Sequence, residues 1–253
     1  MLSEVTNYNL VLFTDEAGEL LLRDHFAPYY FQNPRIKIVQ KPIEEWYNYQ
    51  YKEAWIKNHT KNTSLNGKTE WKVNMLWSEK IHFVNEARLN QYFTDTDFYG
   101  WCDIGYFREG PCPTFCNTPK MLSLNKNKIY YACVDPNQFN SLKEIVSRKN
   151  EKGLPIQPIP PEQVSIAGGF FIAHHSKIEG WRQLFDTKLR LYFENNYLVK
   201  DDQMIIVDCI ISEPQRFHLV GGCPPTPPLV ESTPLLSAQP SENKWFEFRR
   251  FLG

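Results

Sequence analysis

The chain has 253 residues and a formal net charge of −1, from 28 basic and 29 acidic side chains. This balance gives no overall electrostatic attraction for nucleic acid or an anionic membrane, so neither is expected as a partner. The apolar fraction of 42% is enough for a sizeable core and argues against a disordered chain. No apolar run approaches the ~20 residues that span a bilayer, and the polar start MLSEVTNYN is unlike a signal peptide. We therefore expect a soluble, cytoplasmic protein without a transmembrane segment.

The first third of the chain predicts alternating strands and helices. In order we expect a strand, a helix, a strand and an aromatic-rich helix over Asn9–Phe13, Leu20–Phe26, Ile36–Val39 and Ile43–Lys57. The pair Thr14-Asp15 follows the first of these strands directly. A polar stretch up to Lys68 then indicates a loop.

The central part predicts a helix that begins at Ser78 as N-cap and runs to Tyr92. A strand over Phe98–Cys102 follows and leads straight into Asp103-Ile104-Gly105. A second apolar run, Lys128–Val134, predicts another strand.

The last third contains a strand with two glycines, Val164–Ala173, interrupted at Gly168-Gly169. The sequence Ser176-Lys-Ile-Glu179 has the form of a capping box and opens a long amphipathic helix. Asp201-Asp202-Gln203 then precedes Met204–Ile211, an apolar run that suits either a helix or a strand. Phe217–Val220 is the last expected strand.

The alternation of short strands and helices predicts one α/β domain over residues 1–253, with a mixed, mainly parallel central sheet flanked by helices and a proline-rich loop over 221–242. In such sheets, ligands bind beyond the carboxyl ends of the strands. That rule selects three segments as candidate binding elements: Thr14-Asp15, Asp103–Gly105 and Gly168-Gly169.

Two common nucleotide-binding signatures are absent, because the chain has neither G-x-G-x-x-G after a strand nor G-x-x-x-x-G-K-[ST]. What remains is Asp103, an acidic residue at the end of an apolar strand. Such a carboxylate suits a divalent cation that carries a diphosphate, and Gly105 would let the diphosphate approach the backbone closely. A cap or turn aspartate has the same sequence pattern, so both interpretations stay open.

The segment WSEKIHFVNEARLNQYFTDTDFYGWCDIGYFR (Trp77–Arg108) resembles the central block of the WlaTC/HtrL (YibB-type) family of proposed glycosyltransferases. Further similar blocks follow the family's order over most of the chain: NLVLFTDE (Asn9–Glu16), AGGFFIAHHSKIEGW (Ala167–Trp181), KDDQMII (Lys200–Ile206) and WFEFRRFL (Trp245–Leu252). The resemblance implies a GT-A-like, Rossmann-like domain that uses a nucleoside-diphosphate sugar as donor and Mn²⁺ or Mg²⁺ as cofactor. The usual first strand of that fold is expected to be missing here.

By this resemblance, Asp103 corresponds to the first aspartate of an Asp-x-Asp metal motif, and Gly105 stands where the second would be. His218 is a candidate for the missing metal ligand, because many GT-A enzymes place a late ligand there. A histidine between Phe217 and Leu219 can equally be a packed strand residue.

Glycosyl transfer needs positive charge for the leaving diphosphate and a base for the acceptor hydroxyl. Lys80 and Arg88 on the helix before Asp103 are candidates for the charge, and Asp202 for the base. Gly168-Gly169 would let the sugar or acceptor lie against bare backbone. Each of these residues also has a purely structural interpretation. Lys80 and Arg88 can be solvated charges on a helix, Asp202 can be an N-cap, and Gly168-Gly169 can mark a kink in the strand.

The leading hypothesis is a glycosyltransferase that moves a sugar from a nucleoside-diphosphate sugar to a glycan or another hydroxyl acceptor. The alternative is a catalytically inactive GT-A-like domain that binds a glycan or nucleotide, which the glycine at position 105 and the missing strand favour. An NDP-sugar hydrolase or phosphotransferase at the same site, and a plain interaction protein, are further alternatives.

Overall fold

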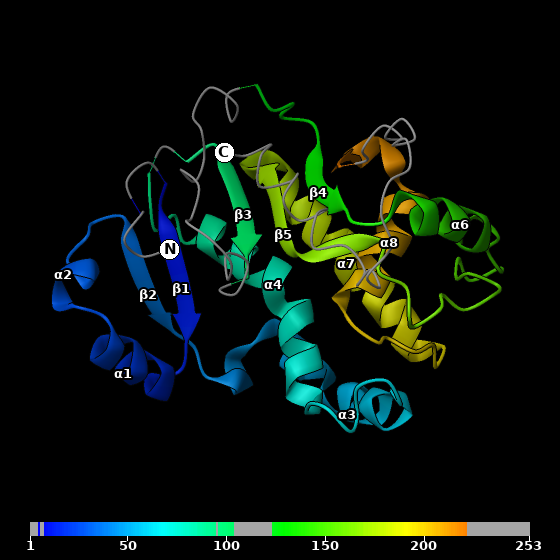
Figure 1. Ribbon diagram of the computed structural model, residues 1–253, viewed down its shortest axis with the longest axis horizontal. Helices are drawn as coiled ribbons and strands as arrows, with labels where there is room; N and C mark the ends of the chain where they lie inside the picture. Colours follow the sequence, from blue (N-terminus) through cyan, green and yellow to red (C-terminus); the bar gives the residue numbers. More distant parts are fainter. Residues whose placement is uncertain (1–4, 6–7, 95, 104–122, 222–253) are drawn as a thin grey trace, which may run out of the picture.

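The computed structural model describes residue 5 and residues 8–94, 96–103 and 123–221. Figure 1 shows the strands β1 (Leu10–Thr14), β2 (Ile36–Gln40), β3 (Phe98–Cys102), β4 (Ile129–Cys133), β5 (Ile166–His174) and β6 (Phe217–Val220). The helices are α1 (Glu16–His25), α2 (Pro28–Phe31), α3 (Lys52–Lys61), α4 (Trp71–Leu89), α6 (Pro136–Ser147), α7 (His175–Glu194) and α8 (Asp202–Ser212). None of these helices is long and apolar enough to cross a bilayer.

The central sheet has the strand order β3-β5-β4-β6. Strand β5 is antiparallel to both of its neighbours, whereas β4 and β6 are parallel. The protein is thus α/β with a mixed sheet, as the sequence predicts. Three strands point the same way and β5 opposes them, so antiparallel pairs outnumber parallel ones in this sheet.

Strands β1 and β2 form a separate parallel pair. Figure 1 places β1 beside β3 with both strands pointing the same way. One ring of α4 joins the two sheets: Phe83 stacks on Phe13 of β1 at 4.6 Å between centroids and on Trp101 of β3 at 5.9 Å. The carboxyl ends of β1 and β3 therefore lie at the same side of the molecule.

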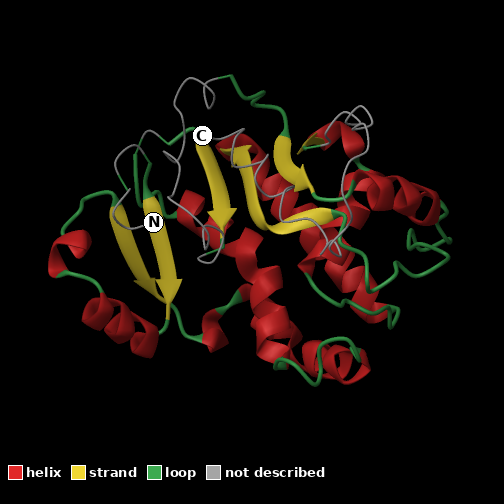
Figure 2. Ribbon diagram, in the orientation of Figure 1, coloured by secondary structure: helices red, strands yellow, loops and turns green. Residues whose placement is uncertain are grey.

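Alternate residues of β4 enter two different apolar clusters, as the two-residue period of a strand requires. Ile129, Tyr131 and Cys133 pack with helices α4, α7 and α8, whereas Tyr130 and Ala132 face the opposite side of the sheet. The helical face carries the larger core. Figure 2 shows these red helices against the yellow strands, and it shows β5 as one strand that bends midway.

The aromatic-rich segment 43–57 does not form one helix, so that prediction is wrong. It forms two 3-10 turns, Ile43–Glu45 and Tyr47–Tyr51, before α3 begins at Lys52. Trp46 is extended between the turns, and the backbone N–H groups of Tyr47 and Asn48 donate to the buried carboxylate of Glu79 at 2.7 and 2.9 Å. A tertiary contact thus replaces the local helical pattern.

Two predicted helix starts are also wrong. Helix α4 begins at Trp71, and Ser78 is buried within it instead of capping it. This helix is buried on several sides around Ser78, so no polar stripe marks its start. Helix α7 begins at His175 with His174 as N-cap, which leaves Ser176 inside the first turn. Apart from Gly221, the loop expected over 221–242 lies outside the described residues.

Candidate active site

Asp103 lies directly beyond the carboxyl end of β3. Its backbone N–H continues the sheet ladder by donating to the carbonyl of Gly169 at 2.8 Å. The indole N–H of Trp101 donates to Asp103 Oδ1 at 2.6 Å, which fixes the orientation of the carboxylate. The side chain remains 41% exposed, so one face of the carboxylate is open to a ligand.

Lys80 brings the other site groups together. It lies on α4, and its Nζ donates to the carbonyl of Gly168 at 2.9 Å and to Asp103 Oδ2 at 3.3 Å. The same nitrogen lies 3.2 Å from Asp202 Oδ2. Burial works to lower the pKa of this ammonium, but the carboxylates of Asp202 and Asp103 outweigh that effect and raise it. Lys80 is therefore a buried cation between two acids.

Asp202 is the first residue of helix α8, and its side chain is only 6% exposed. Burial raises its pKa from 3.8 to about 7, although Lys80 opposes the shift. Asp202 is not the N-cap of α8, which was its alternative role. Asp201 holds the N-cap position, although its side chain makes no capping hydrogen bond. A carboxylate with this pKa exchanges protons readily near neutral pH.

The two glycines of β5 lie in an irregular part of the sheet. Tyr131 pairs with Phe171 and Cys133 with Ile166, so two steps along β4 correspond to five along β5. This bulge turns the Gly168 carbonyl toward Lys80 while Gly169 stays in the ladder. A Cβ at Gly168 would lie 2.9 Å from both carboxylate oxygens of Asp202, so the lack of a side chain there makes room for that acid.

A small pocket opens between α4, α7, α8 and the sheet. Polar and charged groups of Ser78, Lys80 and Asp202 line one part of it. Aromatic rings line the rest, from Trp77, Tyr131, Phe171, Trp181 and Phe185. The pocket has room for about one water molecule, and four of these five rings are buried core residues. Asp103 contacts Lys80, which is one of the residues that line the pocket.

Buried asparagines fix the backbone before Asp202. The carboxamide of Asn58 makes both possible bonds to Val199, from its Nδ2 to the carbonyl at 2.7 Å and from the Val199 N–H to its Oδ1 at 2.9 Å. Asn74 donates to the same carbonyl at 3.1 Å, and Asn62 donates to the carbonyl of Lys200 at 2.9 Å. These contacts tie α3 and α4 to the start of α8.

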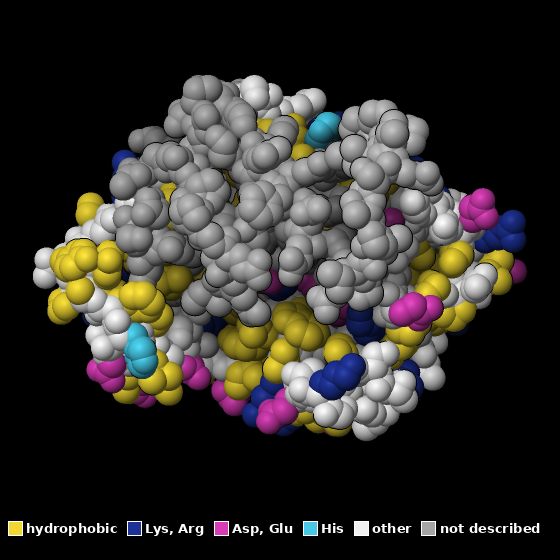
Figure 3. All heavy atoms as spheres, in the orientation of Figure 1, with side chains coloured by type: hydrophobic (Ala, Val, Ile, Leu, Met, Phe, Trp, Pro, Cys, Tyr) yellow, Lys and Arg dark blue, Asp and Glu magenta, His cyan; other side chains and the backbone are white. Residues whose placement is uncertain are grey.

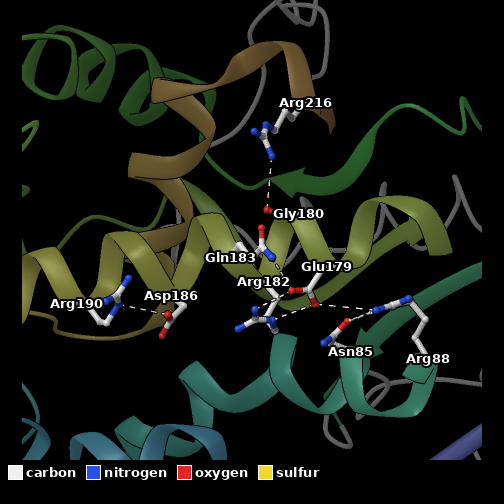
Figure 4. A network of polar contacts seen from close by, with 9 residues as sticks. All are labelled: Asn85, Arg88, Glu179, Gly180, Arg182, Gln183, Asp186, Arg190 and Arg216. Atoms are coloured by element: carbon white, nitrogen blue, oxygen red, sulfur yellow. Dashed lines mark hydrogen bonds and ion pairs between the residues drawn. The ribbon is translucent and has the colours of Figure 1, made fainter. Parts of the chain in front are cut away.

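Arg88 lies away from this group of residues. It is eight residues from Lys80 on the same helix, which is about 12 Å along the helix axis. Figure 4 shows it donating to Asn85 Oδ1 through Nε and Nη2, with Glu179 Oε2 of α7 at 3.9 Å. Glu179 also accepts from Arg182 at 2.7 Å, so Arg88 belongs to the polar contact between α4 and α7.

Thr14 and Asp15 end the neighbouring strand β1. Asp15 caps helix α1, because its Oδ1 accepts from the N–H of Gly18 at 2.7 Å. The Thr14 carbonyl accepts from Lys41 at 2.8 Å. Within the part of the chain that the structure describes, no hydrogen bond or ion pair joins either residue to Lys80, Asp103 or Asp202, although the carboxyl ends of β1 and β3 lie on the same side.

The structure does not bring His218 to Asp103. His218 is an exposed residue near the start of β6, paired with Tyr130 of β4, and β5 lies between β4 and β3. Three strand spacings of ~4.8 Å put it at least about 14 Å away, so one ion could not contact both side chains. Gly105 lies outside the described residues.

Sequence reasoning missed two kinds of site residue. The first is Trp101 as the donor that orients Asp103, although its place two residues earlier on the same strand puts both side chains on one face. The second is the set of buried asparagines, since no local pattern relates Asn58 to Val199, 141 residues later.

No curated protein matches the chain. A solved structure of mouse xyloside xylosyltransferase 1 in its apo form is similar at 11% identity and a TM-score of 0.40, covering 84% of this chain and 71% of that one. A family profile described as "Bacterial protein of unknown function (HtrL_YibB)" matches residues 8–223. The chain therefore belongs to the bacterial HtrL_YibB family.

Proposed function

We propose that this protein is a GT-A-like glycosyltransferase that moves a sugar from a nucleoside-diphosphate sugar to an acceptor hydroxyl. The observation that carries the proposal is the contact of one buried ammonium with two carboxylates: Lys80 Nζ lies 3.2 Å from Asp103 Oδ1 and 3.2 Å from Asp202 Oδ2. The group lies at the carboxyl end of β3, where α/β sheets bind ligands.

Asp202 is the proposed general base. The acceptor oxygen bonds to the anomeric carbon, the bond from that carbon to the diphosphate breaks, and the hydroxyl proton passes to an Asp202 carboxylate oxygen. A pKa of about 7 suits this task, because a base works best when its pKa lies near the working pH.

Asp103 and Lys80 are the residues proposed to bind the diphosphate of the donor. A Mg²⁺ or Mn²⁺ ion can be held by a single carboxylate together with phosphate oxygens, and the half-exposed Asp103 fits that role. Such an ion would neutralise the negative charge of the leaving diphosphate. Lys80 already contacts Asp103, so it adds positive charge at the same place.

The test is release of nucleoside diphosphate from a panel of NDP-sugars, measured with Mn²⁺ and with Mg²⁺. We expect Asp202→Asn to lower kcat at least about a hundredfold, as loss of a general base does. Asp103→Asn should lower kcat by a similar factor, because it removes a charge that holds the ion at the leaving diphosphate. Asp201→Asn is the matched control, because that neighbouring acid pairs with Lys200 at 2.9 Å. Turnover that survives both site substitutions would refute the proposal.

A binding domain without activity is the second candidate. It is favoured by the contacts of Asp103, whose two oxygens already accept from Trp101 and Lys80. This candidate predicts saturable binding of a nucleoside diphosphate that Asp103→Asn weakens, with no turnover for any donor in the panel.

A further inference from the structure

A cluster of metal-ligating side chains lies at the other end of β3 from Asp103. Asp97 precedes the strand, and the antiparallel register pairs Phe98 with His174 at the end of β5. The backbone N–H of His175 donates to the Asp97 carbonyl at 2.8 Å. Asp97 and Asp103 lie six residues apart along an extended strand, which is about 20 Å, so this is a different site from the candidate active site.

We propose that Asp97, His174 and His175 form a binding site for a divalent transition metal of the zinc class. Each of the three side chains offers one ligand atom, and these atoms all lie within 4.8 Å of one another. Ligand atoms around a tetrahedral Zn²⁺ are about 3.4 Å apart, given metal–ligand bonds of about 2.1 Å. Asp97 and His175 are exposed, so their side chains have room to rotate toward that spacing when an ion binds.

The donor set selects the kind of metal. Two imidazoles and one carboxylate suit Zn²⁺ and its first-row neighbours, whereas Mg²⁺ and Ca²⁺ prefer an all-oxygen set. Three protein ligands leave the fourth position of a tetrahedral ion for water. The Nδ1 of His174 lies 2.9 Å from Ser176 Oγ and accepts from the Ser176 N–H at 3.4 Å, which orients the ring. Nε2 is then the nitrogen on the ligand side, and it binds the ion by releasing its proton.

Rigid elements hold two of the ligands in place. His174 is the last residue of β5, and His175 begins the long helix α7. Their rings lie 4.1 Å apart between centroids, and the edge-to-face contact of Phe98 with His174 supports the first ring. An ion bound here would join the start of β3 to the start of α7 and stabilise the folded state by binding it selectively.

Lys126 is a built-in competitor for this site. Its Nζ lies 2.9 Å from Asp97 Oδ2, and both side chains are 58% exposed. The bound ion would displace the ammonium from that carboxylate. Removal of Lys126 should therefore raise the metal affinity, a direction that general damage to the fold would not produce.

The test is calorimetric titration of the metal-stripped full chain with ZnCl₂. We expect about one Zn²⁺ per chain, and at least about a tenfold loss of affinity in Asp97→Asn, His174→Gln and His175→Gln, since even groups that only orient a ligand are worth that much. Lys126→Met should raise the affinity by about three- to fivefold, in line with an exposed ion pair.

His25→Gln is the matched control, because His25 is exposed on α1 and outside the cluster. It should bind zinc like the parent protein, and circular dichroism checks that every variant is folded. The proposal is overturned if the parent chain binds no zinc. Equal zinc affinity in the parent and in both folded histidine variants would also overturn it, because the ion would then lie elsewhere, for example on cysteine.

Discussion

Replacing Lys80 by methionine tests the charge arrangement of the candidate site directly. Methionine keeps most of the apolar length of lysine but removes the ammonium that lies 3.2 Å from Asp202. Removing one partner of a buried ion pair costs about 3–5 kcal/mol, because the other charge stays buried and unpaired. Asp103 adds little to that cost, since its side chain is 41% exposed and water screens it.

The cost should depend strongly on pH. Burial raises the pKa of Asp202 from 3.8 to about 7, so the folded protein binds a proton there that the unfolded chain has released. Stability from this group is therefore full below pH 4 and is lost as the pH rises through 7. At pH 8.5 Asp202 is charged, and Lys80→Met should lower the free energy of unfolding by about 4 kcal/mol.

At pH 5.5 Asp202 is already protonated in the folded parent protein. The variant then loses mainly the hydrogen bond to the Gly168 carbonyl, so the cost should fall to about 1–2 kcal/mol. Burial also raises the pKa of Glu79 to about 7, but this group is present in both proteins and cancels in the difference.

Urea denaturation at the two pH values measures both differences. Combining Lys80→Met with Asp202→Asn is the control, because the asparagine cannot be charged and the extra loss at pH 8.5 should disappear. An equal cost of Lys80→Met at pH 5.5 and 8.5 would refute the view that Lys80 neutralises a buried carboxylate.

Three more predictions concern the residues around this site. Gly168→Ala should lower the free energy of unfolding by about 1–3 kcal/mol, because its Cβ would lie 2.9 Å from the Asp202 oxygens; a urea midpoint equal to that of the parent would contradict the close contact. Asn58→Ala should cost about 1–3 kcal/mol, because the backbone N–H of buried Val199 loses its partner while its carbonyl keeps the bond from Asn74, and faster amide exchange at the start of α8 should accompany the loss. Tyr192→Phe should cost about 1–2 kcal/mol, because its hydroxyl donates at 2.8 Å to the fully buried Asp208; thermal unfolding checks this, and an unchanged melting temperature would argue against that bond.

Local patterns in the sequence were sufficient for several elements. The short apolar runs of β3, β4 and β6 and the three- and four-residue spacing of α7 predict those elements, because one strand or helix face must be apolar to enter the core. A further local signal marks the start of α6. Asp135 caps α6 by accepting from two N–H groups, and Pro136 follows at the first helical position.

Local patterns failed where a distant group supplies the partner. The segment 43–57 is apolar enough for a helix, yet Glu79 captures two of its N–H groups and the chain turns instead. Helix α4 is buried on several sides, so its start at Trp71 has no amphipathic signature. In both cases the local structure depends on packing against residues that are distant in the sequence, and a local periodic pattern does not include those residues.

Residue patterns alone predict the α/β class, the family resemblance, and Asp103, Lys80 and Asp202 as candidate site residues. Which of these candidates meet depends on the tertiary structure. In the fold, Asp103 and Asp202 both lie beside the ammonium of Lys80, whereas Arg88 and His218 lie elsewhere. The rise of the helix and the order of the strands set these distances, and residue types alone do not reveal them. The fold also buries Asp202, and the loss of hydration there raises the pKa of an ordinary aspartate toward neutrality.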